Sequence, residues 1–195
     1  MIAGLLLAAG GARRFGSQKL VVPLNGQPLV RHAAQVLIAA TDAVTAVVGN
    51  DADLVQAALN DLRVAVVENR DWATGLASSL RCGIAALPAD AEAVVIALGD
   101  QPGIDPGVIR SVVARWRAGG STIVATRYAG VQGHPVLFDR SVFGELLALG
   151  GDRGAKPVIE RAGGRVAFVD VAAPAPGDID TPDDLSMIDS PRRDI

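Results

Sequence analysis

The chain has 195 residues, of which half are apolar and one fifth are charged. This composition excludes a disordered or collagen-like chain, and the length is typical of a single domain. The net charge of −3 argues against the broad basic face of a nucleic-acid-binding protein, so we expect no nucleic-acid partner. Because aromatic residues make up only 4%, we expect a core of Ala, Val, Leu and Ile, as in strands packed between helices.

The cysteine count and the first apolar run indicate the cellular location that we expect. Cys82 is the one cysteine of the sequence, so neither an internal disulfide nor a multi-cysteine zinc cage can form. The apolar run at residues 2–12 has no basic segment before it and is followed at once by Arg13 and Arg14, which is not typical of a signal peptide. It is also shorter than the roughly 20 residues that a membrane helix needs. We therefore expect a cytoplasmic protein with no membrane partner.

Short strands alternate with helices along the chain, which is the signature of βαβ units. We expect a three-layer α/β sandwich with a mostly parallel sheet, in a single domain over residues 1–189 with a loose tail at 190–195. Thr181 is the expected N-cap of a last helix that begins at Pro182. Strands are predicted at residues 2–8, 44–48, 63–67, 93–98, 122–125, 135–138 and 166–171, and further helices at 28–39, 51–59, 78–87, 106–117, 141–149 and 155–162.

A loop of small residues follows the first strand directly and carries Arg14 and Lys19. In open α/β sheets, the loops at the carboxyl ends of the strands form the ligand crevice. Small residues let backbone N–H groups approach phosphate oxygens, whose charge Arg14 and Lys19 can neutralise. The loop therefore predicts a phosphate cradle, with an exposed glycine-rich turn as the alternative. Its spacing matches neither a P-loop nor the G-x-G-x-x-G dinucleotide fingerprint.

Carboxylates stand where a metal ion would help such a cradle. Asp100 follows the most hydrophobic strand and should emerge at the sheet edge beside the first loop. Mg²⁺ prefers one or two carboxylates together with phosphate oxygens. Asp178 and Asp180 offer a second carboxylate, with Asp180 slightly preferred, although either can also cap the final helix.

Three further groups are candidates for binding. Gly75, Ser78 and Ser79 stand at a helix start and either bind a base or phosphate or act as ordinary caps. Lys156 follows a glycine-rich turn that contains Arg153, which is either a second anion site or a solvated helix start. His134 precedes a rigid proline, and a lone histidine in such a place is more often structural than catalytic.

Taken together, these motifs resemble a known family. The first loop, with Arg14, Gly16 and Lys19, resembles the L-A-A-G-x-x-x-R-x-G-x-x-K signature of MobA-like nucleotidyltransferases. Later blocks resemble those of its molybdenum cofactor cytidylyltransferases, in the same order; they lie at residues 75–81, 99–102, 133–138, 151–155 and 178–182. Gln18 stands where that family often has proline.

The resemblance implies a Rossmann-like nucleotidyltransferase fold and Mg²⁺ as cofactor. It gives the catalytic roles to Arg14, Lys19 and Asp100 and places the metal on Asp100. Asp180 is the expected second metal ligand, with Asp178 as the open alternative. The expected nucleotide-binding residues are Leu7, Ala8, Ala9, Gly10, Gly11, Lys19, Gly75, Ser78 and Ser79, and the expected acceptor-binding residues are His134, Arg153 and Lys156. Ala9 is similar to the cytidylyltransferases, because guanylyltransferase relatives tend to have glycine there.

The expected reaction moves CMP from CTP to the phosphate of molybdopterin and releases pyrophosphate, with a molybdenum hydroxylase as a partner that receives the product. Three alternatives stay open. The first is the same transfer to another phosphorylated acceptor or from GTP, since a fold alone does not fix a substrate. The second is an oxidoreductase. The third is a protein that binds or inserts the molybdenum cofactor without turnover.

Overall fold

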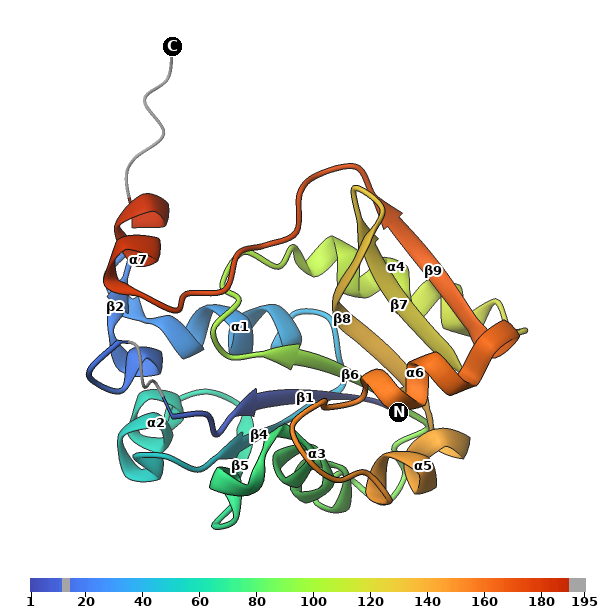
Figure 1. Cartoon of the computed structure of the whole chain (residues 1–195), viewed down its shortest axis with the longest axis horizontal. Helices are drawn as coiled ribbons and strands as arrows, with labels where there is room; N and C mark the ends of the chain where they lie inside the picture. Colours follow the sequence, from blue (N-terminus) through green and yellow to red (C-terminus); the bar gives the residue numbers. More distant parts are fainter. Residues whose placement is uncertain (12–14, 190–195) are drawn as a thin grey trace.

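A computed structural model describes residues 1–11 and 15–189 of the chain. Its centre is a seven-stranded sheet with helices on both faces (Figure 1). The strand order is β5-β4-β1-β6-β8-β7-β9. These strands are β1 (Ile2–Ala8), β4 (Ala43–Val48), β5 (Val64–Glu68), β6 (Ala93–Leu98), β7 (Ile123–Tyr128), β8 (Val131–Asp139) and β9 (Val166–Val171).

The sheet is mostly parallel, as predicted. Four of its six strand pairings are parallel, and β8 alone among the described strands of this sheet runs against its two neighbours, β6 and β7. Reversal of β8 places its amino end beside the carboxyl end of β6, since Val136 pairs with Ile96 and Asp139 pairs with Ala93. Residues from the start of β8 therefore reach the same edge of the sheet as the loops that follow β1 and β6.

Two apolar layers fill the space between sheet and helices. One contains Leu6 of β1 and packs against α1 (Leu29–Ile38), α4 (Pro106–Arg117) and, beyond α1, α2 (Ala52–Leu59). The other contains Leu5 and packs against α3 (Leu76–Ala85), α5 (Phe143–Leu147) and α6 (Lys156–Ala162). Because β1 is buried on both faces, its sequence is apolar without alternation. The three-layer α/β sandwich is confirmed.

The second half of the chain differs most from the predicted elements. The strand expected at 135–138 begins at Val131 and the one expected at 122–125 continues to Tyr128, because the two form an antiparallel pair. The helix expected at 141–149 is wrong at its start, where the structure has a 3-10 turn in place of a first α-helical turn. Asp139 accepts a hydrogen bond from the Ser141 backbone, which starts the 3-10 turn η3 (Arg140–Val142), and α5 follows it.

The helix expected at 78–87 occupies Leu76–Ala85, two residues earlier. The sequence analysis also missed the short hairpin of β2 (Pro23–Leu24) and β3 (Gln27–Pro28) and three 3-10 turns, η1 (Lys19–Val21), η2 (Trp72–Thr74) and η4 (Gly163–Arg165).

The last described helix, α7 (Pro182–Asp189), begins as predicted. The Thr181 hydroxyl accepts a hydrogen bond from the Asp184 backbone, and the Asp184 carboxylate accepts from the Thr181 backbone, which is a capping box. The predicted tail at 190–195 lies outside the described residues. Within residues 1–11 and 15–189, no helix combines the length and the apolar character that crossing a bilayer requires.

Candidate functional site

Three loops meet at the carboxyl ends of β1, β4 and β6. The Ala9 carbonyl accepts a hydrogen bond from the Asn50 backbone at 3.1 Å, which ties the first loop to the turn after β4. The Leu7 carbonyl accepts from the Gly99 backbone at 2.9 Å, which ties β1 to the turn after β6. The candidate site thus lies where open α/β sheets bind ligands.

Lys19 joins two carboxylates at this point. Its Nζ lies 2.8 Å from Asp100 Oδ2 and 2.9 Å from Asp180 Oδ1. Burial alone would lower the pKa of Lys19, but the hydrogen bonds and charges of the two carboxylates outweigh it and raise the pKa above its ordinary value. Lys19 is therefore protonated throughout the neutral range, and the structure brings together three of the predicted catalytic and metal-binding residues.

Asp178 and Asp180 have different partners in the structure. The Ile179 N–H donates to the Asp100 carbonyl at 3.0 Å, and the Ile179 side chain is fully buried. This anchor turns Asp180 toward Lys19, whereas Asp178 accepts a hydrogen bond from the Gln101 side chain at 2.6 Å. Of the two, Asp180 is the carboxylate that shares a cation with Asp100.

The chemistry of this pair fits a hard divalent cation. Asp100 and Asp180 each place an oxygen within hydrogen-bond reach of one positive centre, the Lys19 ammonium. No cluster of three or more His, Cys, Asp or Glu side chains that could hold a metal occurs in the described part of the chain. Two carboxylates that leave further coordination positions to phosphate oxygens are what Mg²⁺ prefers at nucleotide sites.

The described residues at the start of the first loop differ in exposure. Gly10 and Gly11 are exposed, whereas Ala8 and Ala9 are buried, so any contact of these two alanines with a nucleotide runs through their backbone. Leu7 contributes its side chain to the wall of a neighbouring cavity. Arg14 lies outside the described residues.

Two residues to which the sequence analysis gave no role, Trp72 and Gln18, hold this loop in place. A Cβ on Gly11 would lie 3.0 Å from the Trp72 ring, and a Cβ on Gly49 would lie 2.7 Å from Trp72 Cβ, so the indole packs directly on both glycines. Gln18 is buried, and its side chain donates to the Asn50 carbonyl at 2.8 Å and accepts from the Leu20 backbone. Both side chains fix the loop against β4.

The hydroxyls of Ser78 and Ser79 serve the protein interior. Both are buried and accept hydrogen bonds from Asn69 Nδ2 at 2.8 and 3.0 Å, and Ser78 also donates to backbone carbonyls at Asp71 and Gly75. These contacts favour the alternative of ordinary capping for these hydroxyls, because no free oxygen faces a ligand.

The start of α3 is also capped from elsewhere. Asp152 Oδ1 accepts from the Leu76 backbone at 3.0 Å, and the Gly151 carbonyl accepts from the Ala77 backbone at 3.1 Å. Gly75, expected to bind nucleotide, instead lies against this segment, since a Cβ there would be 2.6 Å from the Gly151 carbonyl oxygen. The capping residues lie far from α3 in the sequence, so no local sequence pattern predicts this cap.

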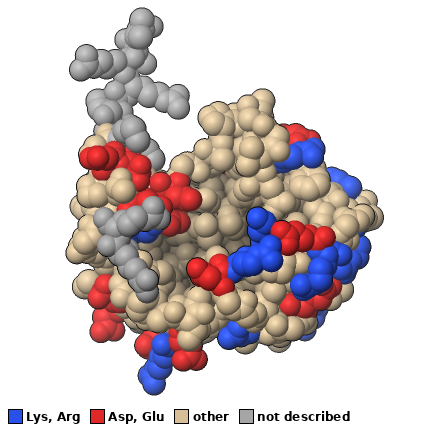
Figure 2. Space-filling view, in the orientation of Figure 1, with Lys and Arg blue, Asp and Glu red and all other residues tan. Residues whose placement is uncertain are grey.

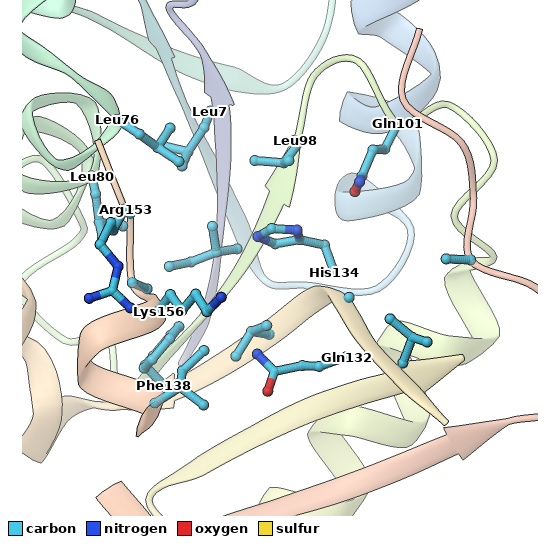
Figure 3. A pocket seen from close by; sticks show the side chains of 18 of the residues that line it. Leu7, Leu76, Leu80, Leu98, Gln101, Gln132, His134, Phe138, Arg153 and Lys156 are labelled. Atoms are coloured by element: carbon cyan, nitrogen blue, oxygen red, sulfur yellow. The ribbon is translucent and has the colours of Figure 1, made fainter. Parts of the chain in front are cut away.

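A cavity of about 910 Å³ adjoins the ends of β1 and β6 (Figure 3). Its wall is largely aliphatic and aromatic and is drawn from both halves of the sheet: Leu7, Leu80, Ile96, Val136, Phe138 and Ile159. Figure 2 shows this face hollowed, with acidic side chains gathered beside α7 and basic ones over α6.

Polar side chains stand at the margins of the cavity. Asp178, paired with Gln101, lines one end, and His134 lies between the two halves. Burial lowers the pKa of His134, an effect that the Asp178 and Asp100 carboxylates partly oppose, so the ring is neutral near pH 7. Arg153 and Lys156 line the other end. The three predicted acceptor-binding residues thus share one cavity, next to the Lys19 cluster.

A family model described as a MobA-like NTP transferase domain matches residues 4–166. The nicotine blue oxidoreductase of Paenarthrobacter nicotinovorans is 30% identical over 191 residues, which cover 92% of each chain. This similarity extends over nearly the full length of both proteins.

Several solved structures are also similar to this chain over nearly its full length. Rv0371c of Mycobacterium tuberculosis H37Rv superposes with a TM-score of 0.87 at 33% identity, covering 97% of this chain and 98% of that one, and a complex of Rv0371c with manganese gives 0.79 over 96% and 97%. A nucleotidyl transferase from Methanothermobacter thermautotroptrophicus, Mth528, has a TM-score of 0.82 at 26% identity, covering 96% of this chain and 95% of that one.

Proposed function

Because the chain belongs to the MobA-like NTP transferase family, we propose that it moves CMP from CTP to the terminal phosphate of molybdopterin and releases pyrophosphate. The observation that carries this proposal is the Lys19 ammonium held between Asp100 and Asp180, at the same edge of the sheet as the exposed Gly10-Gly11 turn. A cavity of about 910 Å³ lies nearby, and its wall includes Gln101, the residue after Asp100. A triphosphate, a divalent cation and a second substrate can meet there.

The chemistry is a phosphoryl-centred displacement. An oxygen of the acceptor phosphate forms a bond to the α-phosphorus of CTP, and the bond from that phosphorus to the bridging oxygen breaks, so that pyrophosphate carries away the electron pair. The nucleophile is already anionic and needs no general base. Positioning and charge neutralisation therefore supply most of the rate.

Different residues of the chain bind the triphosphate, neutralise its charge and hold the metal ion in this proposal. The exposed backbone of Gly10 and Gly11 receives the triphosphate, and Lys19 neutralises the β- and γ-phosphates as they become the leaving group. Arg14, outside the described residues, is proposed to assist Lys19. Asp100 and Asp180 hold Mg²⁺, which supplies charge neutralisation at the phosphate oxygens when it is bound.

The base preference rests on Ala9. The resemblance to the cytidylyltransferases at this position supports CTP, and the structure limits how Ala9 can act. Its methyl group is 3% exposed, and a Cβ on the neighbouring Gly49 would lie 2.9 Å from it. We infer that Ala9 influences base choice by fixing the backbone of the loop, since its side chain is packed against β4.

A rival function has one observation in its favour, the similarity to a protein named nicotine blue oxidoreductase. Hydride transfer would need a nicotinamide or flavin, and the sequence contains no G-x-G-x-x-G fingerprint for a dinucleotide. Oxidation of NAD(P)H with a quinoid dye as electron acceptor, tested in parallel, separates the two functions.

The deciding experiment incubates the protein with each of the four nucleoside triphosphates, Mg²⁺ and molybdopterin, and measures pyrophosphate and the mass of the product. We expect pyrophosphate and a CMP adduct of molybdopterin with CTP, and a loss of at least about a hundredfold in Asp100→Asn. Asp183→Asn, at an exposed position in α7, is the matched control and should retain full activity. No adduct with any triphosphate, or full activity in Asp100→Asn, refutes the proposal.

A further inference from the structure

We propose that Asp152 is a positioning residue that holds Lys156 in place as the anion anchor of the large cavity. This inference rests on the proposed function, because the anion in question is the charged group of the acceptor. It gives Arg153 and Lys156 distinct roles, whereas the sequence analysis assigns both of them to acceptor binding.

The two basic side chains at this end of the cavity differ in their electrostatic surroundings. Arg153 donates from Nη2 to both carboxylate oxygens of Glu160, at 3.0 and 2.9 Å, so its charge is already balanced. Lys156 forms no ion pair and no side-chain hydrogen bond within residues 1–11 and 15–189. Figure 3 shows its side chain extending toward the middle of the cavity, with the Arg153 guanidinium at the side.

An uncompensated ammonium beside apolar walls is suited to an anion. The wall around Lys156 includes Ile159, Phe138 and Val136, which offer few competing hydrogen-bond donors. Lys156 is itself exposed, so an anion can reach it from solvent, and a charge-assisted contact is stronger than one between neutral groups. The cavity therefore suits a ligand with a flat or apolar body and a negatively charged group that reaches Lys156.

Asp152 connects this cation to the rest of the fold. Its carboxylate accepts from the Leu76 backbone at the start of α3, 76 residues away along the chain, and the neighbouring Gly151 carbonyl accepts from Ala77. The Lys156 backbone in turn donates to the Arg153 carbonyl at 3.3 Å, so a single turn separates the Asp152 cap from the first residue of α6.

Two glycines show how closely the segments approach. Gly75, at φ 115°, faces the Gly151 carbonyl, and Gly154, at φ 54°, faces Leu76, where a Cβ would lie 2.7 Å from the leucine side chain. Segment 151–154 is thus seated on α3 by backbone contact as well as by the carboxylate. The place of Lys156 in the cavity follows from this seating.

The test measures binding rather than turnover, with neopterin monophosphate as the probe and its own fluorescence as the signal. We expect Lys156→Met to weaken binding about tenfold, as for the loss of one charge-assisted contact. Arg153→Met should change it by less than about twofold, because Glu160 already balances that charge. Equal binding by wild type and Lys156→Met, or no binding by wild type, overturns the inference.

The positioning role has its own readout. We expect Asp152→Ala to weaken binding about fivefold and Asp152→Asn to restore it, since an amide oxygen accepts the same Leu76 N–H. In the Lys156→Met background, Asp152→Ala should have no further effect, because the two residues act through one contact. An additive loss in the double variant, or failure of Asp152→Asn to restore binding, assigns Asp152 a general structural role and overturns that part.

The outcome is separable from the proposed reaction. If wild type binds the phosphopterin through Lys156 but transfers no CMP, the reaction proposed above is wrong and the assignment of Lys156 stands. If CMP transfer proceeds and Lys156→Met binds the probe as well as wild type does, the reaction stands and the assignment is wrong.

Discussion

Lys19 shows how one cation can neutralise two different sets of anionic groups. In the structure its ammonium neutralises Asp100 and Asp180, and in the proposed reaction it neutralises phosphate instead. The juxtaposition of Lys19 and Asp100 was predictable, because both follow neighbouring strands at the same edge of the sheet. The part of Asp180 was not, since only the Ile179 hydrogen bond to the Asp100 carbonyl decides which acidic residue turns inward.

We therefore predict opposite effects of Lys19→Met on metal and on turnover. Removal of the ammonium takes away a positive charge that competes with a divalent cation for the two carboxylates, so the affinity for Mn²⁺ without nucleotide should rise several-fold, measured by electron paramagnetic resonance. CMP transfer should fall at least about a hundredfold. Lys156→Met, in the cavity, is the control and should leave Mn²⁺ binding unchanged. Unaltered Mn²⁺ affinity in Lys19→Met would contradict the shared site.

Ala9 gives a second prediction at this scale. Wild-type protein should use CTP in preference to GTP, and Ala9→Gly should narrow the ratio of the two kcat/KM values, because the loop backbone loses the packing of a methyl group against Gly49. Ala8→Gly, at the adjacent buried position that ends β1, controls for general loosening. A preference for GTP in the wild type would remove the basis for this inference.

His134 gives a pH dependence. Burial lowers its pKa in the folded protein below the ordinary value of about 6.5. The unfolded chain then binds the proton more readily, so this residue's contribution to stability is complete above about pH 6.5 and is lost as the pH falls through that value. We expect Tm to fall less between about pH 8 and about pH 5 in His134→Gln than in wild type, measured by calorimetry. The same decrease in Tm with pH in wild type and His134→Gln would be inconsistent with a neutral ring whose pKa is lowered by burial.

At the scale of the elements, α3 packs closely on β1 and β4. A Cβ on Gly83 would lie 2.4 Å from Leu5 Cδ1 and 2.9 Å from Val47 Cγ2, both in fully buried side chains. We predict that Gly83→Ala lowers the free energy of unfolding by about 1–3 kcal/mol through overpacking, measured by urea denaturation.

The matched control for this prediction is Gly144 in α5. Nothing lies within 4 Å of a Cβ there, so Gly144→Ala should leave stability unchanged or raise it slightly. Equal effects of the two substitutions would show that helix propensity, and not the packing of α3 on β1, sets the outcome.

Element type was predictable wherever the hydrophobic period was strong. The strands β1, β4 and β6 and the helices α1 and α4 lie within one or two residues of their predicted bounds. Prediction failed where contacts distant in sequence set the bounds. The β8 strand extends to Val131 because β7 pairs with it, and α3 starts at Leu76 because Asp152 caps it.

At the scale of the whole molecule, we propose that residues 1–189 form a single domain, because one seven-stranded sheet lies between the two apolar layers. Urea should then unfold the protein in one transition, with coincident fluorescence and circular dichroism signals. Removal of residues 190–195 should leave the midpoint unchanged. Two transitions, or a lower midpoint after truncation, would refute this division.

The same experiment can report on ligand binding. At about one hundred times its Kd, a ligand that binds only the folded state adds about 2.7 kcal/mol of stability. CTP with Mg²⁺ should therefore raise Tm by several degrees in wild type and by much less in Asp100→Asn. The same rise in both proteins would place the nucleotide away from Asp100.

Because β8 runs antiparallel to β6, the proposed active site is built from two parts of the chain that reach the same edge of the sheet separately. In the proposed reaction, triphosphate binding draws on the loops after β1 and β6. Gln132 and His134 come from the start of β8, whose hairpin with β7 is joined at Ala129 and Gly130. Exchange of this hairpin tip between relatives would therefore be expected to change which second substrate is accepted while the nucleotide chemistry is inherited intact. A fold that is assembled in this way can acquire new acceptors without rebuilding the half that handles the triphosphate.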